Sequence, residues 1–388
     1  MHTPFAPSLF RSFWLAGFES SCHRTRGGVR LDMLEATQHD RFLDVDYANL
    51  RAMGLLTVRD TVRWHRVEPV AGHFDFSSVE AYVETAGRHG IEVVWDLLHY
   101  GWPDGLDLFD DAFVARFARF CGATVRYLRE RTAGTLFVTP INELSFFAWA
   151  AGEVGWFHPH ARQRGGEVKR QLVRAWIAAV DAMREVDPGV RLVSVEPLIH
   201  TVAPRGLEDV DGLAAAQTES QWEAWDMIAG QRAPELGGGP GYLDIIGANF
   251  YHDNQWEVPG GKKLAWHVHP RDDRWVPFHR LLLGAWERYR RPILIGETSH
   301  VGIGRAEWIR EVTDEVILAT AAGVPLEGLC LYPIVDRFEW ENPAHWHNSG
   351  LWDLEHQADG ALHRVLNVPY ANELRRSQRR LAEVGLGG

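Results

Sequence analysis

Short apolar segments alternate with longer amphipathic segments along most of the chain. The short segments have the length and near-continuous hydrophobicity of parallel strands that are covered on both faces. Eight such segments span residues 13–18, 55–59, 91–98, 136–140, 191–195, 243–250, 292–296 and 328–333. Between them, apolar residues recur at helical spacing, most clearly in 110–132, 166–189 and 306–323. The pattern therefore predicts an α/β protein in which strands and helices alternate.

Eight strands that alternate with helices predict a (β/α)8 barrel. The chain has no Pro/Ser-rich linker and no short repeat, so residues 1–388 are expected to form a single barrel domain. Two doubly wound halves are the alternative, but no G-x-G-x-x-G sequence follows the first strand. Irregular stretches at 231–241, 252–277 and 333–364 are expected as βα loops or insertions on the rim, with active-site loops after strands four, six and eight.

Charge and cysteine content exclude several classes of function. The formal net charge of −12 argues against a nucleic-acid partner held through its phosphates. The three cysteines, Cys22, Cys121 and Cys330, form no C-x-x-C pair, so neither a disulfide framework nor a thiolate zinc site is indicated. No signal-peptide pattern and no bilayer-length apolar run is present. We therefore expect a cytoplasmic protein without a membrane partner, and we make no prediction of its oligomeric state.

Polar residues stand at the ends of the predicted strands. In a (β/α)8 barrel the active site lies at the C-terminal ends of the strands, so these residues should converge. They are Arg59, His99, Asn142, Glu143, Glu196, Asn249, Tyr251, Glu297 and Tyr332, followed in the last loop by Asp336, Glu339 and Trp340. Of these, Glu196 is left open between a direct substrate contact and a supporting acid, and Asp336 is expected to brace the loop.

Two carboxylates facing each other across the mouth of a barrel are what glycoside hydrolysis requires. One protonated acid donates to the leaving oxygen, and the other attacks the anomeric carbon or activates water. Glu143, between Ile141 and Phe146, has the apolar surroundings that raise a carboxyl pKa. Glu297 has to stay ionised, and Arg59 and the Tyr251 hydroxyl are the candidates to hold it so.

Several motifs resemble those of family 1 glycoside hydrolases of the β-glucosidase type. They are "TPINE" (139–143), "DIIGANFY" (244–251), "PILIGE" (292–297), "DRFEW" (336–340), "RDTVRWHRVEP" (59–69) and "GEVGWFHP" (152–159). The resemblance extends from the first predicted strand to the eighth and also implies a (β/α)8 barrel. Because the chain is shorter than is usual for the family, we expect trimmed rim loops.

The resemblance implies a role for each matching residue. Glu143 becomes the acid/base and Glu297 the nucleophile of a retaining β-glycosidase, with Arg59, Asn249 and Tyr251 in support. Sugar contacts are implied for His23, His99, Asn142, Tyr332, Glu339 and Trp340. Among these, His99 and Asn142 correspond to contacts with the reacting sugar, and Glu339 and Trp340 to contacts with its far hydroxyls.

Some of the matching positions depart from the family pattern. His23 stands in place of a glutamine, Leu144 in place of the proline after the acid, and Tyr332 in place of a tryptophan. We interpret these departures as the mark of a divergent β-glycosidase that acts on a small-molecule carbohydrate or glycoside.

Three other functions stay open. They are a transglycosidase that uses the same glutamates, a catalytically silent carbohydrate-binding barrel, and a metal-dependent hydrolase built on histidines. His267-x-His269 and His345-x-His347 raise the last possibility, but neither pair has a clear third ligand. The two-glutamate chemistry needs no metal and no cofactor, and we expect neither.

Overall fold

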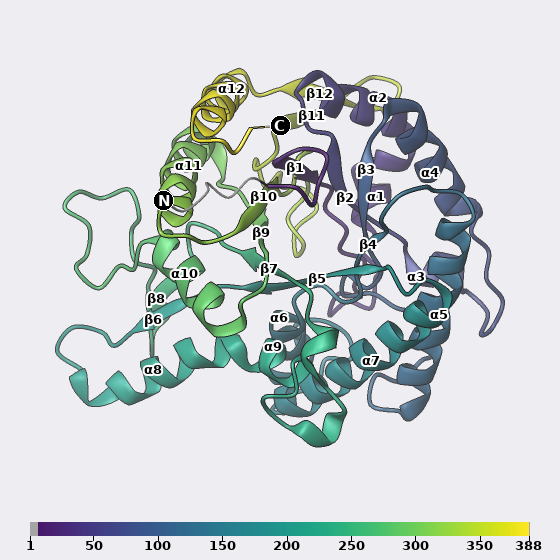
Figure 1. The fold of residues 1–388 in the computed structure, drawn as a ribbon, viewed down its shortest axis with the longest axis horizontal. Helices are drawn as coiled ribbons and strands as arrows, with labels where there is room; N and C mark the ends of the chain where they lie inside the picture. Colours follow the sequence, from purple (N-terminus) through teal and green to yellow (C-terminus); the bar gives the residue numbers. More distant parts are fainter. Residues whose placement is uncertain (1–6, 388) are drawn as a thin grey trace.

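Eight parallel strands close into a barrel at the centre of the protein (Figure 1). The computed structural model describes residues 7–387 of the chain. The barrel strands are β1 (Trp14–Gly17), β2 (Thr57–Thr61), β3 (Glu92–Asp96), β4 (Phe137–Thr139), β5 (Arg191–Pro197), β7 (Ile245–Asn249), β9 (Ile293–Thr298) and β10 (Leu326–Leu331). Each overlaps one of the eight segments predicted as strands, so the predicted α/β fold with a (β/α)8 barrel is confirmed.

The barrel closes through β1, which pairs with β2 on one side and with β10 on the other. Leu15 marks this closure, because it is in register with Thr57 of β2 and with Cys330 of β10. Side chains that point inward fill the interior as a packed core. That core contains Leu15, Val94, Phe137, Val193, Val195, Ile245, Leu294, Cys330 and Tyr332. The site chemistry is therefore confined to the ends of the barrel.

Helices surround the barrel and bury their apolar faces against the strands (Figure 1). They are α1 (Met33–Ala36), α2 (His39–Ala52), α3 (Trp64–Val67), α4 (Ser77–His89), α5 (Asp111–Arg129), α6 (Leu144–Ala148), α7 (Gly165–Val186), α8 (Asp211–Glu219), α9 (Glu223–Ile228), α10 (Phe278–Tyr289), α11 (Arg305–Ala321) and α12 (Val368–Glu383). The three clearest helix predictions correspond to α5, α7 and α11. None of the helices in residues 7–387 combines the length and the apolar character needed to cross a membrane.

Local chemistry explains where the long helices begin and end. Asp110 caps α5, since its side chain accepts a hydrogen bond from the Ala112 N–H. Arg126 and Arg129 lie in the last turn of the same helix, where cations complement the helix dipole. Helix α7 ends at Val186, two residues before Pro188, which cannot continue a helical hydrogen-bond ladder.

Two small sheets lie outside the barrel. Strands β6 (His200–Val202) and β8 (Gln255–Glu257) pair in parallel near α8, while β11 (Trp352–His356) and β12 (Leu362–Leu366) form an antiparallel hairpin near α12 (Figure 1). The irregular stretches 252–277 and 333–364 do follow barrel strands, β7 and β10. The stretch 231–241 instead connects α9 to β7, so it leads into the N-terminal end of a strand and is not a βα loop.

Candidate active site

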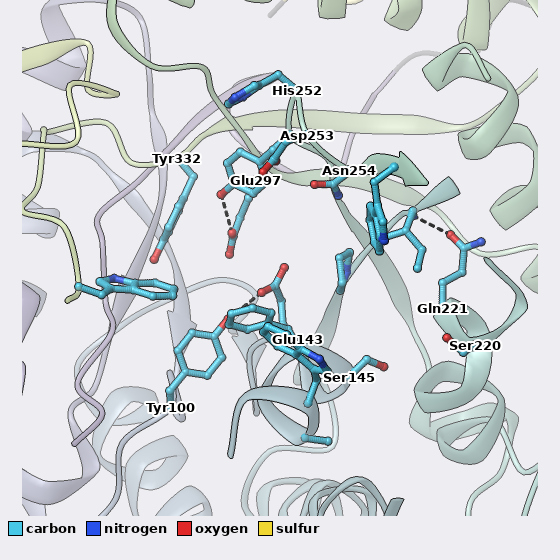
Figure 2. A pocket seen from close by; sticks show the side chains of 18 of the residues that line it. Tyr100, Glu143, Ser145, Ser220, Gln221, His252, Asp253, Asn254, Glu297 and Tyr332 are labelled. Carbon is cyan, nitrogen blue, oxygen red and sulfur yellow. Dashed lines mark hydrogen bonds between the residues drawn. The ribbon is translucent and has the colours of Figure 1, made fainter. Parts of the chain in front are cut away.

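A cavity of about 850 Å³ lies at the C-terminal ends of the barrel strands. Figure 2 shows the side chains of Glu143 and Glu297 approaching each other near its centre. Glu143 lies after β4 and directly before α6, and Glu297 belongs to β9. Tyr100 and Tyr332 lie on one side of this pair, and Ser220 and Gln221 lie on the other. The two carboxylates therefore divide the cavity into two parts.

Glu297 is held by two donors, one at each carboxylate oxygen. Nη1 of Arg59 lies 2.8 Å from Oε1, and the Tyr251 hydroxyl donates to Oε2 over 2.8 Å. Nη1 of Arg59 also donates to the Gly296 carbonyl over 3.0 Å, which anchors the guanidinium to β9. These are the two partners expected from the sequence. A charge-assisted hydrogen bond and a hydroxyl donor both stabilise the carboxylate anion.

Glu143 sits in a different environment. Its carboxyl group accepts hydrogen bonds from the Tyr100 hydroxyl at 2.7 Å and from Nδ2 of Asn249 at 2.9 Å, but no cation contacts it within residues 7–387. Burial and the nearby charge of Glu297 raise the pKa of Glu143 to about 8. At neutral pH the group is therefore protonated and able to donate a proton, whereas the contacts of Glu297 favour an anion.

The backbone at Glu143 is strained into the left-handed region, with φ of 44°. Such a conformation costs a non-glycine residue about 1–3 kcal/mol and persists only where its surroundings hold it. The Glu143 N–H donates to the Val195 carbonyl over 3.1 Å, and the Phe147 N–H donates to the Glu143 carbonyl over 2.8 Å. Leu144, the first residue of α6, is fully buried. The backbone at Glu143 is thus held by hydrogen bonds to β5 and to α6.

Glu196 supports this turn from the end of β5. Its carboxylate accepts the Ser145 N–H at 3.0 Å, at the beginning of α6, and its side chain is fully buried outside the cavity wall. Burial raises the pKa of Glu196 to about 7. Of the two roles left open for this residue, these contacts favour the supporting acid.

A hydrogen-bond network behind the cavity wall connects the partners of the two glutamates. Oδ1 of Asn142 accepts from Nη2 of Arg59 at 2.9 Å, and Nδ2 of Asn142 donates to the Tyr100 hydroxyl at 3.0 Å. Asn142 therefore lies between the partner of Glu297 and the partner of Glu143. It is fully buried and is not part of the cavity wall, so its expected contact with the sugar is not visible in this geometry.

His99 occupies the cavity wall as expected. Its Nδ1 lies 2.9 Å from Oδ2 of Asp96, which orients the ring, and its Nε2 faces Nδ2 of Asn142 at 3.2 Å. Burial disfavours the charged imidazole, but the carboxylate of Asp96 outweighs it and raises the pKa of His99. The ring of Tyr332 lies parallel to the His99 ring, and both rings border the cavity.

Two expected sugar-binding residues do not reach the cavity. His23 is buried against Phe157, with ring centroids 3.8 Å apart, and it is not part of the cavity wall. Glu339 is 47% exposed and faces Nε2 of His347 at 4.0 Å, also outside the wall. The loop after β10 instead presents Trp340 and Arg337 to the cavity. The structure thus places His23 and Glu339 outside the cavity wall, and the sugar contacts implied for them stay predictions.

Sequence reasoning missed four residues that shape the site, namely Glu19, Asp96, Tyr100 and Arg337. Glu19 comes two residues after β1, so the rule that polar residues follow barrel strands could have found it. Asp96 is the last residue of β3 and precedes His99 by three positions. Tyr100 and Arg337 directly follow His99 and Asp336, but no feature of the sequence indicated a role for Tyr100 or Arg337 themselves.

Histidines and acids do not gather into a metal site in the part of the chain that the structure describes. No group of three His, Cys, Asp or Glu side chains is arranged to hold an ion within residues 7–387. Cys22, Cys121 and Cys330 are buried and free. The polar side chains of the cavity wall carry carboxyl, guanidinium, ammonium, amide, hydroxyl and imidazole groups.

The fold is that of family 1 β-glucosidases. The family 1 β-glucosidase from Thermotoga maritima superposes with a TM-score of 0.74 at 15% identity, covering 99% of each chain. The virulence factor SghA, solved with its substrate analog salicin, superposes with a TM-score of 0.72 at 19% identity, covering 88% of this chain and 85% of SghA. Comparison of the sequence with protein-family models and with curated proteins finds no match.

Proposed function

We propose that the protein is a retaining β-glycosidase that hydrolyses O-glycosidic bonds through Glu143 and Glu297. The observation that carries this proposal is the contrast between the two facing carboxyl groups. Glu143 is buried and has no cationic partner among residues 7–387, and burial together with Glu297 raises its pKa to about 8. Glu297 binds a guanidinium and a hydroxyl. A protonated acid opposite an anionic nucleophile is the arrangement that double displacement requires.

The first step of the reaction forms a covalent intermediate. Glu143 donates its proton to the glycosidic oxygen while the carboxylate of Glu297 attacks the anomeric carbon, and the aglycone leaves. Arg59 and Tyr251 keep Glu297 oriented toward that carbon, because each of them donates a hydrogen bond to a different carboxylate oxygen. The glycone is then joined to Glu297 as an ester.

The second step uses the same residues with the proton moving the other way. Esterification removes the negative charge of Glu297, which is one cause of the raised pKa of Glu143. The pKa of Glu143 therefore falls in the intermediate, and its carboxylate can take a proton from a water molecule whose oxygen attacks the anomeric carbon. The bond between that carbon and Glu297 breaks, which releases the sugar and restores the Glu297 carboxylate. The coupling between the two groups thus lets one residue serve as acid and then as base.

The structural neighbours support this class of reaction. β-Glucosidases from Thermotoga maritima with the same fold were solved with deoxynojirimycin and with noeuromycin. A bound sugar mimic in those proteins is consistent with a glycoside site at the equivalent end of the barrel, where this chain has its cavity.

Replacement of the nucleophile tests the proposal. Glu297→Ala should lower the turnover of an aryl β-glycoside by about 10⁴-fold or more. Azide should restore turnover and yield a glycosyl azide of inverted configuration, since the small anion attacks from the face that Glu297 leaves empty. Glu167→Ala, at an exposed position of α7, is the matched control and should keep normal activity. Near-native activity of Glu297→Ala would refute the assignment.

A further inference from the structure

One side of the cavity ends in an ion pair between a half-buried arginine and a buried glutamate, which the proposed mechanism does not use. Nε of Arg337 lies 3.0 Å from Oε2 of Glu19, and both residues are part of the wall that also contains Glu143 and Glu297. Glu19 follows β1, and Arg337 lies in the loop after β10, so the pair bridges the point where the barrel closes.

The pair keeps free hydrogen-bonding capacity. Oε1 of Glu19 accepts the Ser21 N–H at 3.1 Å and the Ser21 hydroxyl, but Oε2 accepts no hydrogen bond from residues 7–387. The Nε of Arg337 lies near Oε2 of Glu19 but is not aligned for a hydrogen bond. The Nη2 of Arg337 donates no hydrogen bond within the described chain. An acceptor and a donor therefore lie side by side at the cavity wall, as neighbouring sugar hydroxyls require.

The pair lies on the side of the cavity that should hold the glycone. His99 and Tyr332 border that side, and the Tyr332 hydroxyl lies 3.5 Å from both Oε1 of Glu19 and Nε2 of His99. Glu143 must face the leaving oxygen, and the side of the cavity opposite Tyr100 and Tyr332 contains Ser220 and Gln221 (Figure 2). The aglycone consequently extends toward those residues, and the glycone toward Glu19.

Among the described residues, every lysine and arginine side chain that borders the cavity is paired with a carboxylate. The cations that border the cavity each have a carboxylate partner, since Arg337 pairs with Glu19, Lys169 with Glu223 and Lys263 with Asp253. Burial lowers the pKa of His347 to about 4, so this ring is neutral at pH 7. No unpaired cation among the wall residues is available for a buried anionic group, and burying an unpaired anion is costly.

We infer that Glu19 and Arg337 bind the hydroxyls of the glycone that are far from the anomeric carbon, and that their mutual neutralisation selects an uncharged sugar over a uronic acid. This inference rests on the proposed glycosidase function and adds its substrate class. It assigns to Glu19 and Arg337 the task that the family resemblance implied for Glu339.

Matched substrate pairs test the charge rule. Aryl β-glucoside and β-glucuronide, and aryl β-galactoside and β-galacturonide, differ only in an uncharged hydroxymethyl group against a carboxylate. The wild-type kcat/KM should be at least about a hundredfold higher for the neutral member of the preferred pair. Glu19→Gln should lower kcat/KM for the neutral substrate by about tenfold to a hundredfold, which is the effect of losing a charged hydrogen-bond partner.

The two variants should shift selectivity in opposite directions. Glu19→Gln leaves the Arg337 cation unpaired, so the uronide-to-neutral ratio of kcat/KM should rise at least tenfold. Arg337→Met leaves the Glu19 anion unpaired, so that ratio should fall further. If the Glu19–Arg337 pair only stabilised the loop, each variant would lower kcat/KM by the same factor for the neutral substrate and for the uronide. This result would overturn the inference. Glu339→Gln, outside the cavity, should change KM less than about twofold, whereas a larger effect there than at Glu19 would also overturn it.

Failure of the inference can be told apart from failure of the proposed function. If neutral glycosides are cleaved in a Glu297-dependent way and the Glu19→Gln ratio does not move, the inference is wrong and the function stands. If no glycoside is cleaved, calorimetric titration with isofagomine lactam, an uncharged sugar mimic, tests the inference directly. Its Kd should weaken at least fivefold in Glu19→Gln and stay unchanged in Glu339→Gln, and equal Kd values would overturn the inference.

Discussion

Arg59 and Glu297 form a buried ion pair across the barrel, with Nη1 of Arg59 lying 2.8 Å from Oε1 of Glu297. The second terminal nitrogen of Arg59 lies 3.2 Å from Oδ2 of Asp96, so one guanidinium stands between two carboxylates. Arg59 is only 1% exposed, and water cannot replace these partners. Removing one member of a buried ion pair leaves its partners uncompensated, so Arg59 should contribute both to stability and to the orientation of Glu297, the proposed nucleophile.

Arg59→Met should therefore destabilise the fold by about 3–5 kcal/mol and abolish measurable turnover. Urea unfolding followed by tryptophan fluorescence measures the first effect, and an aryl glycoside assay measures the second. Arg88→Met is the matched control, because the Arg88 side chain is 55% exposed and pairs with Asp44 at the surface. The control should lose less than about 1 kcal/mol. A comparable loss in the two variants would contradict the buried-pair argument.

The raised pKa of Glu143 should set the alkaline limit of the proposed glycosidase activity. Glu143 must be protonated to donate to the leaving oxygen, so kcat/KM should fall tenfold per pH unit above about pH 8. Glu143→Gln removes this proton, and its kcat/KM for a substrate with a dinitrophenolate leaving group should lose the alkaline decline. An alkaline limb that persists unchanged in Glu143→Gln would assign the titration to another group.

The same shift makes a prediction for stability, with a defined sign. A carboxyl group whose pKa is raised in the folded state binds its proton more tightly there, so it stabilises the fold below the ordinary glutamate pKa of about 4.3. That contribution is lost as the pH rises toward about 8. Thermal unfolding between pH 4.5 and pH 8 should show a smaller loss of stability in Glu143→Gln than in the wild type.

Glu196 should act on catalysis through position and charge without touching the substrate. Its charge is one of the causes that raise the pKa of Glu143, so Glu196→Gln should move the alkaline limb of kcat/KM to lower pH. The amide oxygen of glutamine can still accept the Ser145 N–H, whereas Glu196→Ala leaves that buried donor unsatisfied at a cost of about 1–3 kcal/mol. A pH profile identical to the wild type in Glu196→Gln, with full stability in Glu196→Ala, would contradict this role.

The barrel was predictable because its strands are continuous apolar segments whose length and spacing need no tertiary information. The small outer sheet was not, since β6 and β8 have three residues each and pair across more than fifty positions of the chain. Arg59 in β2 and Tyr251, two residues after β7, have the Glu297 contacts expected from the sequence, because a barrel strand limits the direction of side chains in it and close to its end.

Residues in the last loop were harder to place. Glu339 and Arg337 lie two positions apart in 333–364, which has no periodicity, and nothing in the local pattern says which of the two faces the cavity. Arg337 faces the cavity and Glu339 does not, because Arg337 pairs with Glu19 across the point where the barrel closes. Such a contact between residues distant in sequence is not visible in the local pattern. His23 shows the same limit, since stacking on Phe157 decides its orientation.

Gly17, the last residue of β1, should prove indispensable for the position of Tyr332. A Cβ at residue 17 would lie 2.3 Å from Cδ2 of the Tyr332 ring, and that ring is buried and borders the cavity. Gly17→Ala should therefore destabilise the fold by about 1–3 kcal/mol through overpacking. It should also push Tyr332 toward the bound sugar, so KM for an aryl glycoside should rise about tenfold or more.

A double-mutant cycle isolates this contact from general effects of alanine. Tyr332→Ala removes the ring that a Cβ would strike, so Gly17→Ala should cost clearly less stability in that background than in the wild type. Gly87→Ala is the matched control, because a Cβ there meets no atom within 4 Å and the position is helical. Alanine is the better helix former by about 1 kcal/mol, so the control should be neutral or slightly stabilising. Equal costs of Gly17→Ala in the two backgrounds would show that the strain arises elsewhere, for example against Sγ of Cys330, which a Cβ would approach to 3.2 Å.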